Sequence, residues 1–371
     1  MEKASNTVTL LAGGDVGPVI KPVDQFAEKI LPVLRQADIR FAQCERVYSR
    51  GGYPPHFRLG GSGNHTRLHP EMASIFKTAM IDVVSLASNA AMNWGPEPVL
   101  DTIELFRTMG IQVIGAGKDD KEARSPVIID RNGIRIAILA YCSVARDGQY
   151  AGPGKPGVAP MRAHTYYETF DNQPGTPPKI ITVPYEDDLK TLQEDIGRAK
   201  TQSDVVILSL HWGVHFVPKV IATYQPQVAH AAIDAGADLI LGHHPHILKA
   251  VEVYKGKVCF YSIGNFITTG SQVRRTPFEW NLYWWRMEPN SMYEFSVESQ
   301  NTMLAKVVLS KKGVERVSFL PTFINKQAQP ETVKRDDDRF QEILSYMEWV
   351  SDQFPHCFKV EGEEVVVQSS L

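Results

Sequence analysis

The chain has 371 residues, of which 43% are hydrophobic, and its formal net charge is −3. A chain of this length and apolar content can bury a large core, so we expect one large α/β domain. The near-neutral charge argues against nucleic-acid binding as the main role and against electrostatic attraction to a membrane. The apolar run near the N-terminus is only about five residues long and lacks a cleavage pattern, so we expect a cytoplasmic protein without a signal peptide or membrane anchor.

The four cysteines are far apart and form no CxxC pair. Cys44, Cys142 and Cys259 lie in apolar runs typical of strands, which favours buried free thiols over a disulfide framework. Free thiols fit a reducing, cytoplasmic compartment.

Strands and helices alternate along the first half of the chain. We predict helices at residues 22–37, from about residue 70, and at residues 97–109, and strands at residues 8–12, 39–44, 82–87, 112–114 and 135–141. Residues 146–182 then interrupt the alternation. This insertion is rich in Gly, Pro and Tyr and shows no clear periodic element, so we expect it to lie over the active site.

The alternation resumes after the insertion and weakens toward the C-terminus. We predict helices at residues 186–201, 227–235 and 336–353, strands at 205–210, 237–241 and 258–262, and a hairpin of strands 303–309 and 314–320. An aromatic segment occupies residues 276–296; it either shapes a substrate pocket or belongs to a core or a dimer interface. We therefore predict a main domain over residues 1–275 and a C-terminal extension over 276–371, packed on the same domain, with homo-oligomerisation as a possibility.

Polar side chains follow directly on the predicted strands. They are Asp15, Glu45, Asn89, His211 and the run His243-His244-Pro245-His246. Open α/β folds bind their ligands at the carboxyl ends of strands. Carboxylates, an amide and neutral imidazoles suit Zn, Fe or Mn better than Ca or Mg. One or two such divalent ions, a pair lying about 3.5–4 Å apart, would support hydrolysis.

Most of these residues also have an ordinary structural explanation. Asp15 is able to cap the next segment, Glu45 to lie on the surface, and Asn89 to satisfy loop backbone groups. His211 beside a tryptophan fits a core histidine, and His230 fits a helix face. The run of three histidines from His243 to His246 is the hardest to explain by packing.

In these motifs the chain resembles the CapA, or poly-γ-glutamate capsule biosynthesis, branch of the calcineurin-like metallophosphatases. The matching segments occur in the family order over residues 8–267: Gly14-Asp15-Val16, Glu45, Ser85-Leu86-Ala87-Ser88-Asn89, Gly115-Ala116-Gly117, His211-Trp212-Gly213, Gly242-His243-His244-Pro245-His246 and Tyr261-Ser262-Ile263-Gly264-Asn265-Phe266. The resemblance implies a four-layer αββα sandwich with metals at the strand ends.

The resemblance also assigns roles to residues. Asp15 and His246 would hold one metal and Glu45 would bridge. Asn89, His211 and either His243 or His244 would hold the other. We expect Asn89 and His215 to be catalytic, and His65, Trp212 and Asn265 to contact the substrate.

Several positions depart from the family pattern. The usual histidine of the third strand end is Ala90, the usual aspartate nearby is Asn93, the usual asparagine before Glu45 is Gln43, and the usual glutamate after His-Trp-Gly is His215. Ala90 is unable to protonate a leaving group. His215 is our preferred replacement. His65 in Gly63-Asn64-His65 is the alternative, although His65 and His69 also fit ordinary surface histidines.

We therefore expect a metal-dependent hydrolase whose metal-activated water attacks a phosphoester or a γ-glutamyl or similar amide bond in a small or oligomeric organic substrate. Two alternatives stay open. One is a non-haem iron enzyme with lyase or redox chemistry on the same scaffold, because a shell of histidines and carboxylates also suits iron. The other is an accessory protein of capsule or polyglutamate synthesis.

Overall fold

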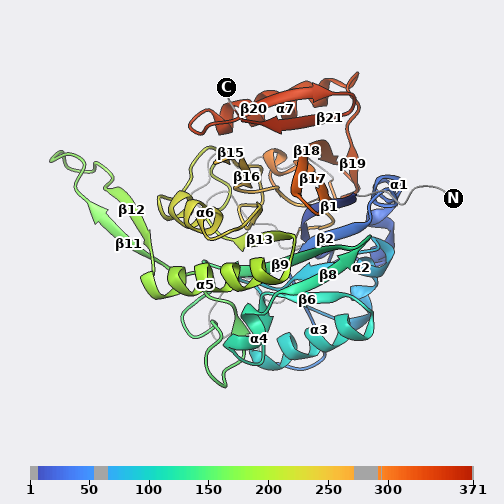
Figure 1. Cartoon of the computed structure of the whole chain (residues 1–371), viewed down its shortest axis with the longest axis horizontal. Helices are drawn as coiled ribbons and strands as arrows, with labels where there is room; N and C mark the ends of the chain where they lie inside the picture. Colours follow the sequence, from blue (N-terminus) through green and yellow to red (C-terminus); the bar gives the residue numbers. More distant parts are fainter. Residues whose placement is uncertain (1–6, 54–65, 271–290, 294, 370–371) are drawn as a thin grey trace.

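The computed structural model describes residues 7–53, 66–270, 291–293 and 295–369. Two mixed sheets dominate this part of the chain (Figure 1). The larger has nine strands in the order β20-β21-β18-β17-β1-β2-β5-β6, with β19 beside β18. Its strands are β1 (Val8–Val16), β2 (Ile39–Cys44), β5 (Val83–Ser85), β6 (Gln112–Ile114), β17 (Asn301–Ser310), β18 (Gly313–Ile324), β19 (Pro330–Thr332), β20 (Cys357–Glu361) and β21 (Glu364–Gln368).

The smaller sheet has six strands in the order β15-β16-β14-β13-β9-β8. They are β8 (Val127–Arg131), β9 (Ile134–Cys142), β13 (Val205–His211), β14 (Leu239–His243), β15 (Val251–Tyr254) and β16 (Lys257–Phe260). Its four central strands β9, β13, β14 and β16 are parallel, and so are β1, β2, β5 and β6 of the larger sheet. Each parallel set therefore presents its carboxyl ends at one edge.

Strand β13 explains why the molecule has layers on both sides of the smaller sheet. Val205 and Ile207 belong to the core between the two sheets. Val206 and Leu208, which point the opposite way because side chains alternate along a strand, belong to a second core beneath helices α5 (Glu186–Gln202) and α6 (Tyr224–Asp234). A strand covered on both faces reads as a continuous apolar run, as residues 205–210 do.

Helix α3 (Pro96–Thr108) and the short helix α2 (Ser74–Thr78) complete the layers beside the larger sheet, and Phe76 and Phe106 pack against each other there. The predicted four-layer α/β sandwich is confirmed. Other helical segments in the described ranges are η1 (Val23–Ala27), α1 (Leu31–Leu34), η3 (Pro70–Ala73), α4 (Asp120–Arg124), η5 (Val297–Ser299) and α7 (Asp338–Ser351).

The predicted helix over residues 22–37 is wrong in length. The structure has a 3-10 turn, η1, and a separate four-residue helix, α1, with Pro32 in its first turn. Proline has no N–H to donate to the preceding turn, so a single helix does not continue through this position.

The insertion at residues 146–182 contains regular structure that we did not predict. Strand β10 (Gly157–Val158) pairs with β7 (Ala116–Gly117), and β11 (Ala163–Glu168) pairs with β12 (Lys179–Pro184) in a hairpin that projects from the body (Figure 1). Nearly every residue of β11 is exposed. A strand with no buried face lacks the apolar alternation by which strands are recognised in a sequence.

The C-terminal residues belong to the larger sheet. The predicted hairpin is present as β17 and β18, and β17 pairs antiparallel with β1 at the opposite end of the chain. A further hairpin, β20–β21, extends this side, and β3 (Val47–Tyr48) pairs with β4 (Arg67–Leu68). Most of the aromatic segment at 276–296 lies outside the described residues. Across the described ranges, no helix combines the length and apolar character needed to span a membrane.

Candidate metal centre

The two sheets meet at the carboxyl ends of β1, β2, β13 and β14. His211 and His243 are paired in register at the ends of β13 and β14. Asp15, near the end of β1, forms a bridge with Asn265, and its carbonyl accepts a hydrogen bond from Phe266 N at 3.0 Å. A Cβ at Gly14 would lie 1.9 Å from the carbonyl oxygen of Gly264, so β1 and the segment after β16 approach this closely only because residue 14 is glycine.

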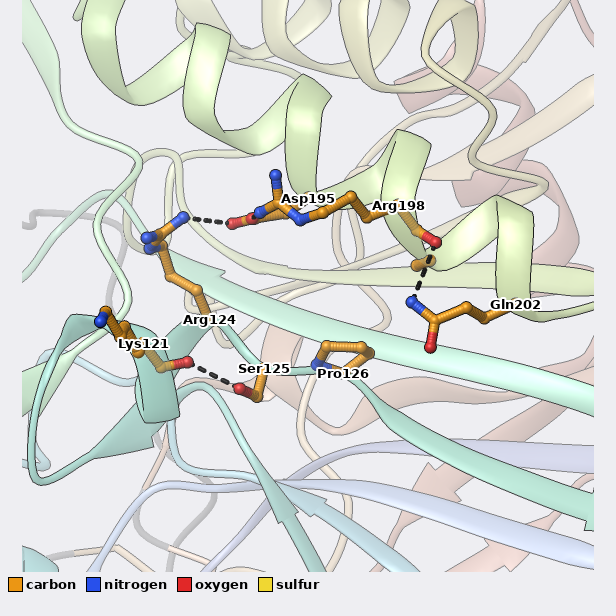
Figure 2. Close-up of a pocket in the computed structure, with 8 residues that line it drawn as sticks. Lys121, Arg124, Ser125, Pro126, Asp195, Arg198 and Gln202 are labelled. Carbon is orange, nitrogen blue, oxygen red and sulfur yellow. Dashed lines mark hydrogen bonds and ion pairs between the residues drawn. The ribbon is translucent and has the colours of Figure 1, made fainter.

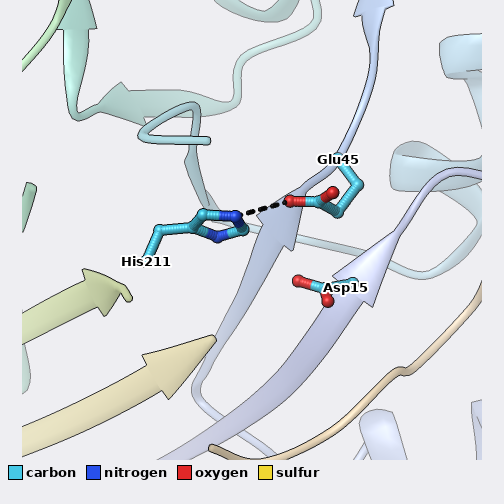
Figure 3. A group of neighbouring side chains, drawn as sticks. All are labelled: Asp15, Glu45 and His211. Atoms are coloured by element: carbon cyan, nitrogen blue, oxygen red, sulfur yellow. Dashed lines mark ion pairs between the residues drawn. The ribbon is translucent and has the colours of Figure 1, made fainter. Parts of the chain in front are cut away.

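Asp15, Glu45 and His211 form a buried cluster where the sheets meet (Figure 3). Each offers one ligand atom, and these atoms all lie within 4.8 Å of one another. Nε2 of His211 is 3.2 Å from Oε1 of Glu45. Two carboxylates and an imidazole are a donor set that binds Zn, Fe or Mn.

Asn89 and Ser88 follow β5 and extend the cluster from the neighbouring strand end. Oδ1 of Asn89 lies 2.8 Å from Nε2 of His211, and the hydroxyl of Ser88 donates to Oε1 of Glu45 at 2.9 Å. The structure therefore places Asn89 beside His211, the residue with which the family resemblance grouped it. Ser88 was not predicted, although it stands one residue before a predicted strand-end asparagine.

His246 lies on the Asp15 side of the cluster. Its Nδ1 is 3.0 Å from Oδ2 of Asp15 and 2.8 Å from Oδ1 of Asn265, whose own Nδ2 donates to Tyr293 Oη at 2.6 Å. Asn265 is fully buried. These contacts orient the ring of His246, and the predicted contact of Asn265 with the substrate stays a prediction.

His243 and His244 occupy the same turn in different ways. His243 is fully buried, and neither of its ring nitrogens has a hydrogen-bond partner among the described residues. A buried polar side chain without a partner is unfavourable by roughly 1–3 kcal/mol, which a bound cation would relieve. His244 has φ of 97°, a left-handed conformation that is rare outside glycine and is found at functional sites.

Burial sets the protonation of most of these groups. It lowers the pKa of His243 to about 4 and also lowers the pKa of His211 and His244, so these imidazoles are neutral near pH 7 and able to act as ligands. Burial, together with the charge of Asp15, raises the pKa of Glu45 to about 7. Two buried carboxylates beside neutral imidazoles fit a divalent cation, which would compensate their charge.

A cavity of about 270 Å³ adjoins the cluster. It is lined by Asn89, Asn93, Val144, Arg146, His215 and His244. The rings of His215 and His244 lie 3.7 Å apart between centroids. His215 thus comes from the loop after β13 to the wall of the cavity. Ala90 is buried, and its N–H donates to the hydroxyl of Ser88.

Other predicted contacts lie elsewhere. Trp212 is fully buried, stacks on Tyr261 and donates from Nε1 to the Tyr261 carbonyl at 3.0 Å, so it packs in the core rather than facing a substrate. His65 lies outside the described residues. His69 caps the turn at η3 and is partly exposed, which fits an ordinary surface histidine. His230, on helix α6, pairs with Glu252 at 2.8 Å, which fits a histidine on a helix face.

Three further residues at this end of the molecule were not predicted. Arg146 lines the cavity four residues after β9, Gln149 contacts Asn93, and Lys249 is buried beneath the loop that carries His215. A lysine inside the apolar run 247–251 was a signal in the sequence that could have identified Lys249 as a buried charged residue. Arg146 and Gln149 lie in an irregular loop, where no periodicity marks a position.

A second cavity of about 190 Å³ lies between α4 and α5 (Figure 2). Arg124 and Arg198 both pair with Asp195 there, the former at 2.8 Å. Arg124 also pairs with Asp120 at 3.4 Å, so both arginines of this cavity have carboxylate partners within the protein, and the predicted site residues are not among those lining it.

The four-layer sandwich, with carboxylates and imidazoles gathered at its strand ends, defines a metallophosphatase-like α/β protein. Within that class, the chain belongs to the family of bacterial capsule synthesis protein PGA_cap, whose family model matches residues 9–269.

Proteins similar in sequence agree with this assignment. PGA biosynthesis protein CapA of Bacillus subtilis (strain 168) is 27% identical over 325 residues, covering 87% of this chain and 71% of that protein. Capsule biosynthesis protein CapA of Bacillus anthracis is 28% identical over 244 residues, covering 66% of this chain and 51% of its own length. Among solved structures, a hypothetical protein from Thermus thermophilus aligns with a TM-score of 0.45 and 15% identity over 84% of this chain and 98% of that one.

Proposed function

We propose that this protein is a metal-dependent hydrolase that acts on a phosphoester or on a γ-glutamyl or similar amide bond. The observation that carries the proposal is the buried cluster of Asp15, Glu45 and His211, beside which His243 keeps two ring nitrogens without partners among the described residues. A cation held there would act as a Lewis acid, which lowers the pKa of water and offsets negative charge in the transition state.

The protein's own groups would supply the remaining functions. Asp15, Glu45 and His211 would hold the cation, with His243, His246 and Asn89 as further ligands. His215, in the cavity wall, would deliver or accept a proton in place of the histidine that Ala90 replaces. The names of the two Bacillus relatives, which refer to PGA and capsule biosynthesis, support a glutamyl polymer or its precursor as substrate.

Elemental analysis tests the proposal. The protein is purified without chelator or a metal-binding tag, and its Zn, Mn and Fe content is measured before and after reconstitution. We expect one or two equivalents, and hydrolysis of either p-nitrophenyl phosphate or γ-glutamyl p-nitroanilide. The absence of metal binding after reconstitution would refute the proposal. Iron together with oxygen-dependent turnover would instead identify the non-haem iron alternative.

The variant Ala90→His separates the two substrate classes. If the substrate is a phosphoester, an imidazole restored at this position is expected to increase p-nitrophenyl phosphate hydrolysis by about 10²-fold, the lower range for a general acid. Ala91→His, one residue further along, is the matched control. Because His215 would already supply the proton in the proposed site, the comparison is repeated with His215→Ala as the parent. If the folded, metal-loaded double variant Ala90→His, His215→Ala shows no gain over His215→Ala, the phosphoester is disfavoured and the amide is favoured.

An accessory role in polymer synthesis is the second candidate, because both Bacillus relatives are named as biosynthesis proteins. In that case the metal would be structural. We would then expect full metal occupancy, a lower unfolding temperature on chelation, and no hydrolysis of either chromogenic substrate.

A further inference from the structure

The cavity beside the metal cluster is rich in hydrogen-bond donors. Five of its six lining side chains are polar: two amides, one guanidinium and two imidazoles, with no carboxylate among them. Asn89 belongs both to this wall and to the cluster, since its Oδ1 lies 2.8 Å from Nε2 of His211. A group bound in the cavity would therefore sit directly beside the candidate metal site.

The two amides have their acceptor oxygens engaged by the protein. Oδ1 of Asn89 faces His211, and Oδ1 of Asn93 accepts a hydrogen bond from Nε2 of Gln149 at 3.3 Å. When the oxygen of an amide is engaged in this way, its NH₂ group is left to donate hydrogen bonds to a ligand. Both asparagines thus act toward the cavity as donors.

Gln149 links this arrangement to Arg146. The backbone N–H of Arg146 donates to Oε1 of Gln149 at 3.0 Å, so one buried glutamine holds both the Arg146 backbone and the Asn93 amide. The Arg146 side chain reaches the cavity from a segment that is exposed to solvent. A guanidinium presents a planar set of N–H donors that matches the oxygens of a carboxylate or a phosphate.

We infer that this cavity binds an anionic oxygen group of the substrate, a carboxylate or a phosphate, through Arg146 and Asn93. The inference rests on the proposed function and names the charge of its substrate. Asn93 stands where the resembled family carries an aspartate. A carboxylate at that position would repel an anion, whereas the amide donates to it.

The cavity volume limits what binds there. Small-molecule sites are typically about 300–1,000 Å³, and this cavity is about 270 Å³. It therefore fits the anionic end of a substrate rather than a whole oligomer, whose remaining length would extend toward solvent on the Arg146 side.

Calorimetric titration of the full-length, metal-loaded protein tests the inference, with inorganic phosphate and L-glutamate as the two probes. Arg146→Ala and Asn93→Asp are each expected to weaken binding of the favoured probe at least tenfold, which corresponds to about 1.4 kcal/mol. Arg146→Lys is expected to lose less affinity for the probe than Arg146→Ala, because lysine keeps the positive charge. Arg135→Ala removes an exposed arginine at the start of β9, the end of the strand away from Arg146, and is the matched control, with unchanged affinity.

The probe that responds to the variants identifies the anion as phosphate or carboxylate. The inference would be overturned if Arg146→Ala and Asn93→Asp both bound the probe as tightly as the wild type. It would also be overturned if the wild type bound neither probe at millimolar concentration. Metal content is measured on the same samples. Metal without anion binding refutes only this inference, whereas anion binding without metal refutes the proposed hydrolase and leaves the anion site.

Discussion

The surroundings of His243 are the strongest single-residue indication of a metal centre. Its neighbour His246 has partners in Asp15 and Asn265, whereas both nitrogens of His243 lack partners among the described residues although the side chain is fully buried. Folded proteins rarely leave such groups unpaired, because each lost hydrogen bond to water is uncompensated. An ion that takes the lone pair of one ring nitrogen removes the larger part of this deficit, because it gives the buried imidazole a strong partner.

Asp15→Asn tests the centre at a single side chain. The substitution keeps the shape of the side chain and removes one of two buried carboxylates, so we expect at least tenfold weaker metal binding, measured by elemental analysis after equilibrium dialysis. Excess metal should also raise the unfolding temperature of the variant less than that of the wild type.

His164→Ala is the matched control for this prediction, since it removes an exposed imidazole on β11. It should keep full metal content. Full occupancy in Asp15→Asn would show that Asp15 is not a ligand.

Among the connections between elements, the segment 212–223 between β13 and α6 decides where His215 lies. Phe216 N donates to the Pro245 carbonyl at 3.0 Å, and Nζ of Lys249 donates to the carbonyls of Val217 and Val220. Phe216 and Lys219 both have positive φ, 57° and 62°. The loop therefore depends on contacts with the segment that follows β14, which also carries His244 and His246.

Lys249 gives this loop a pH dependence. Burial lowers its pKa to about 7, below the ordinary 10.5 of the unfolded chain. Between pH 7 and 10.5 the unfolded state binds the proton and the folded state does not, so the free energy of unfolding rises with pH in this window. We expect wild type to gain up to about 1.4 kcal/mol per pH unit relative to Lys249→Met, measured by urea denaturation of metal-free protein.

Lys190→Met, which removes an exposed lysine of α5, serves as the control and should follow the wild-type profile. Parallel profiles for Lys249→Met and wild type would mean that the folded protein keeps Lys249 charged throughout this range.

Across the molecule as a whole, the two ends of the chain build one sheet. Residues Val8 to Ala12 of β1 pair with Leu309 to Ala305 of β17, and Leu304, Val307 and Phe319 belong to the main hydrophobic core. β1 is thus an interior strand, and the position of Asp15 at its end depends on residues that follow it by almost three hundred positions.

Truncation after residue 275 is therefore expected to abolish cooperative unfolding and metal binding, because β1 loses its neighbour and the core loses the apolar residues of β17 and β18. Urea denaturation followed by circular dichroism measures this. As a control, residues 169–178 at the exposed tip of the β11–β12 hairpin are replaced by Asn-Gly, which joins the paired residues Glu168 and Lys179. A cooperative truncated protein would instead establish residues 1–275 as an independent domain.

Much of the fold was predictable because its signals are local. The predicted strand at 205–210 is observed at Val205–His211, and the predicted helix at 186–201 is observed at Glu186–Gln202. Errors arose where local signals mislead or vanish. Pro32 starts a new short helix within a run that otherwise reads as one continuous helix, and β11 has no buried face to produce an alternation.

The amino-acid sequence alone was enough to locate the central strands and the ligand-type side chains that end them, since both depend on residues a few positions apart. Which of those side chains meet is a property of the folded chain. Folding set Asn89 against His211, placed Trp212 in the core, turned Asn265 toward His246, and brought Arg146 and Asn93 to one cavity. These distances follow from how the two sheets pack and where their crossovers run, which no short stretch of sequence encodes.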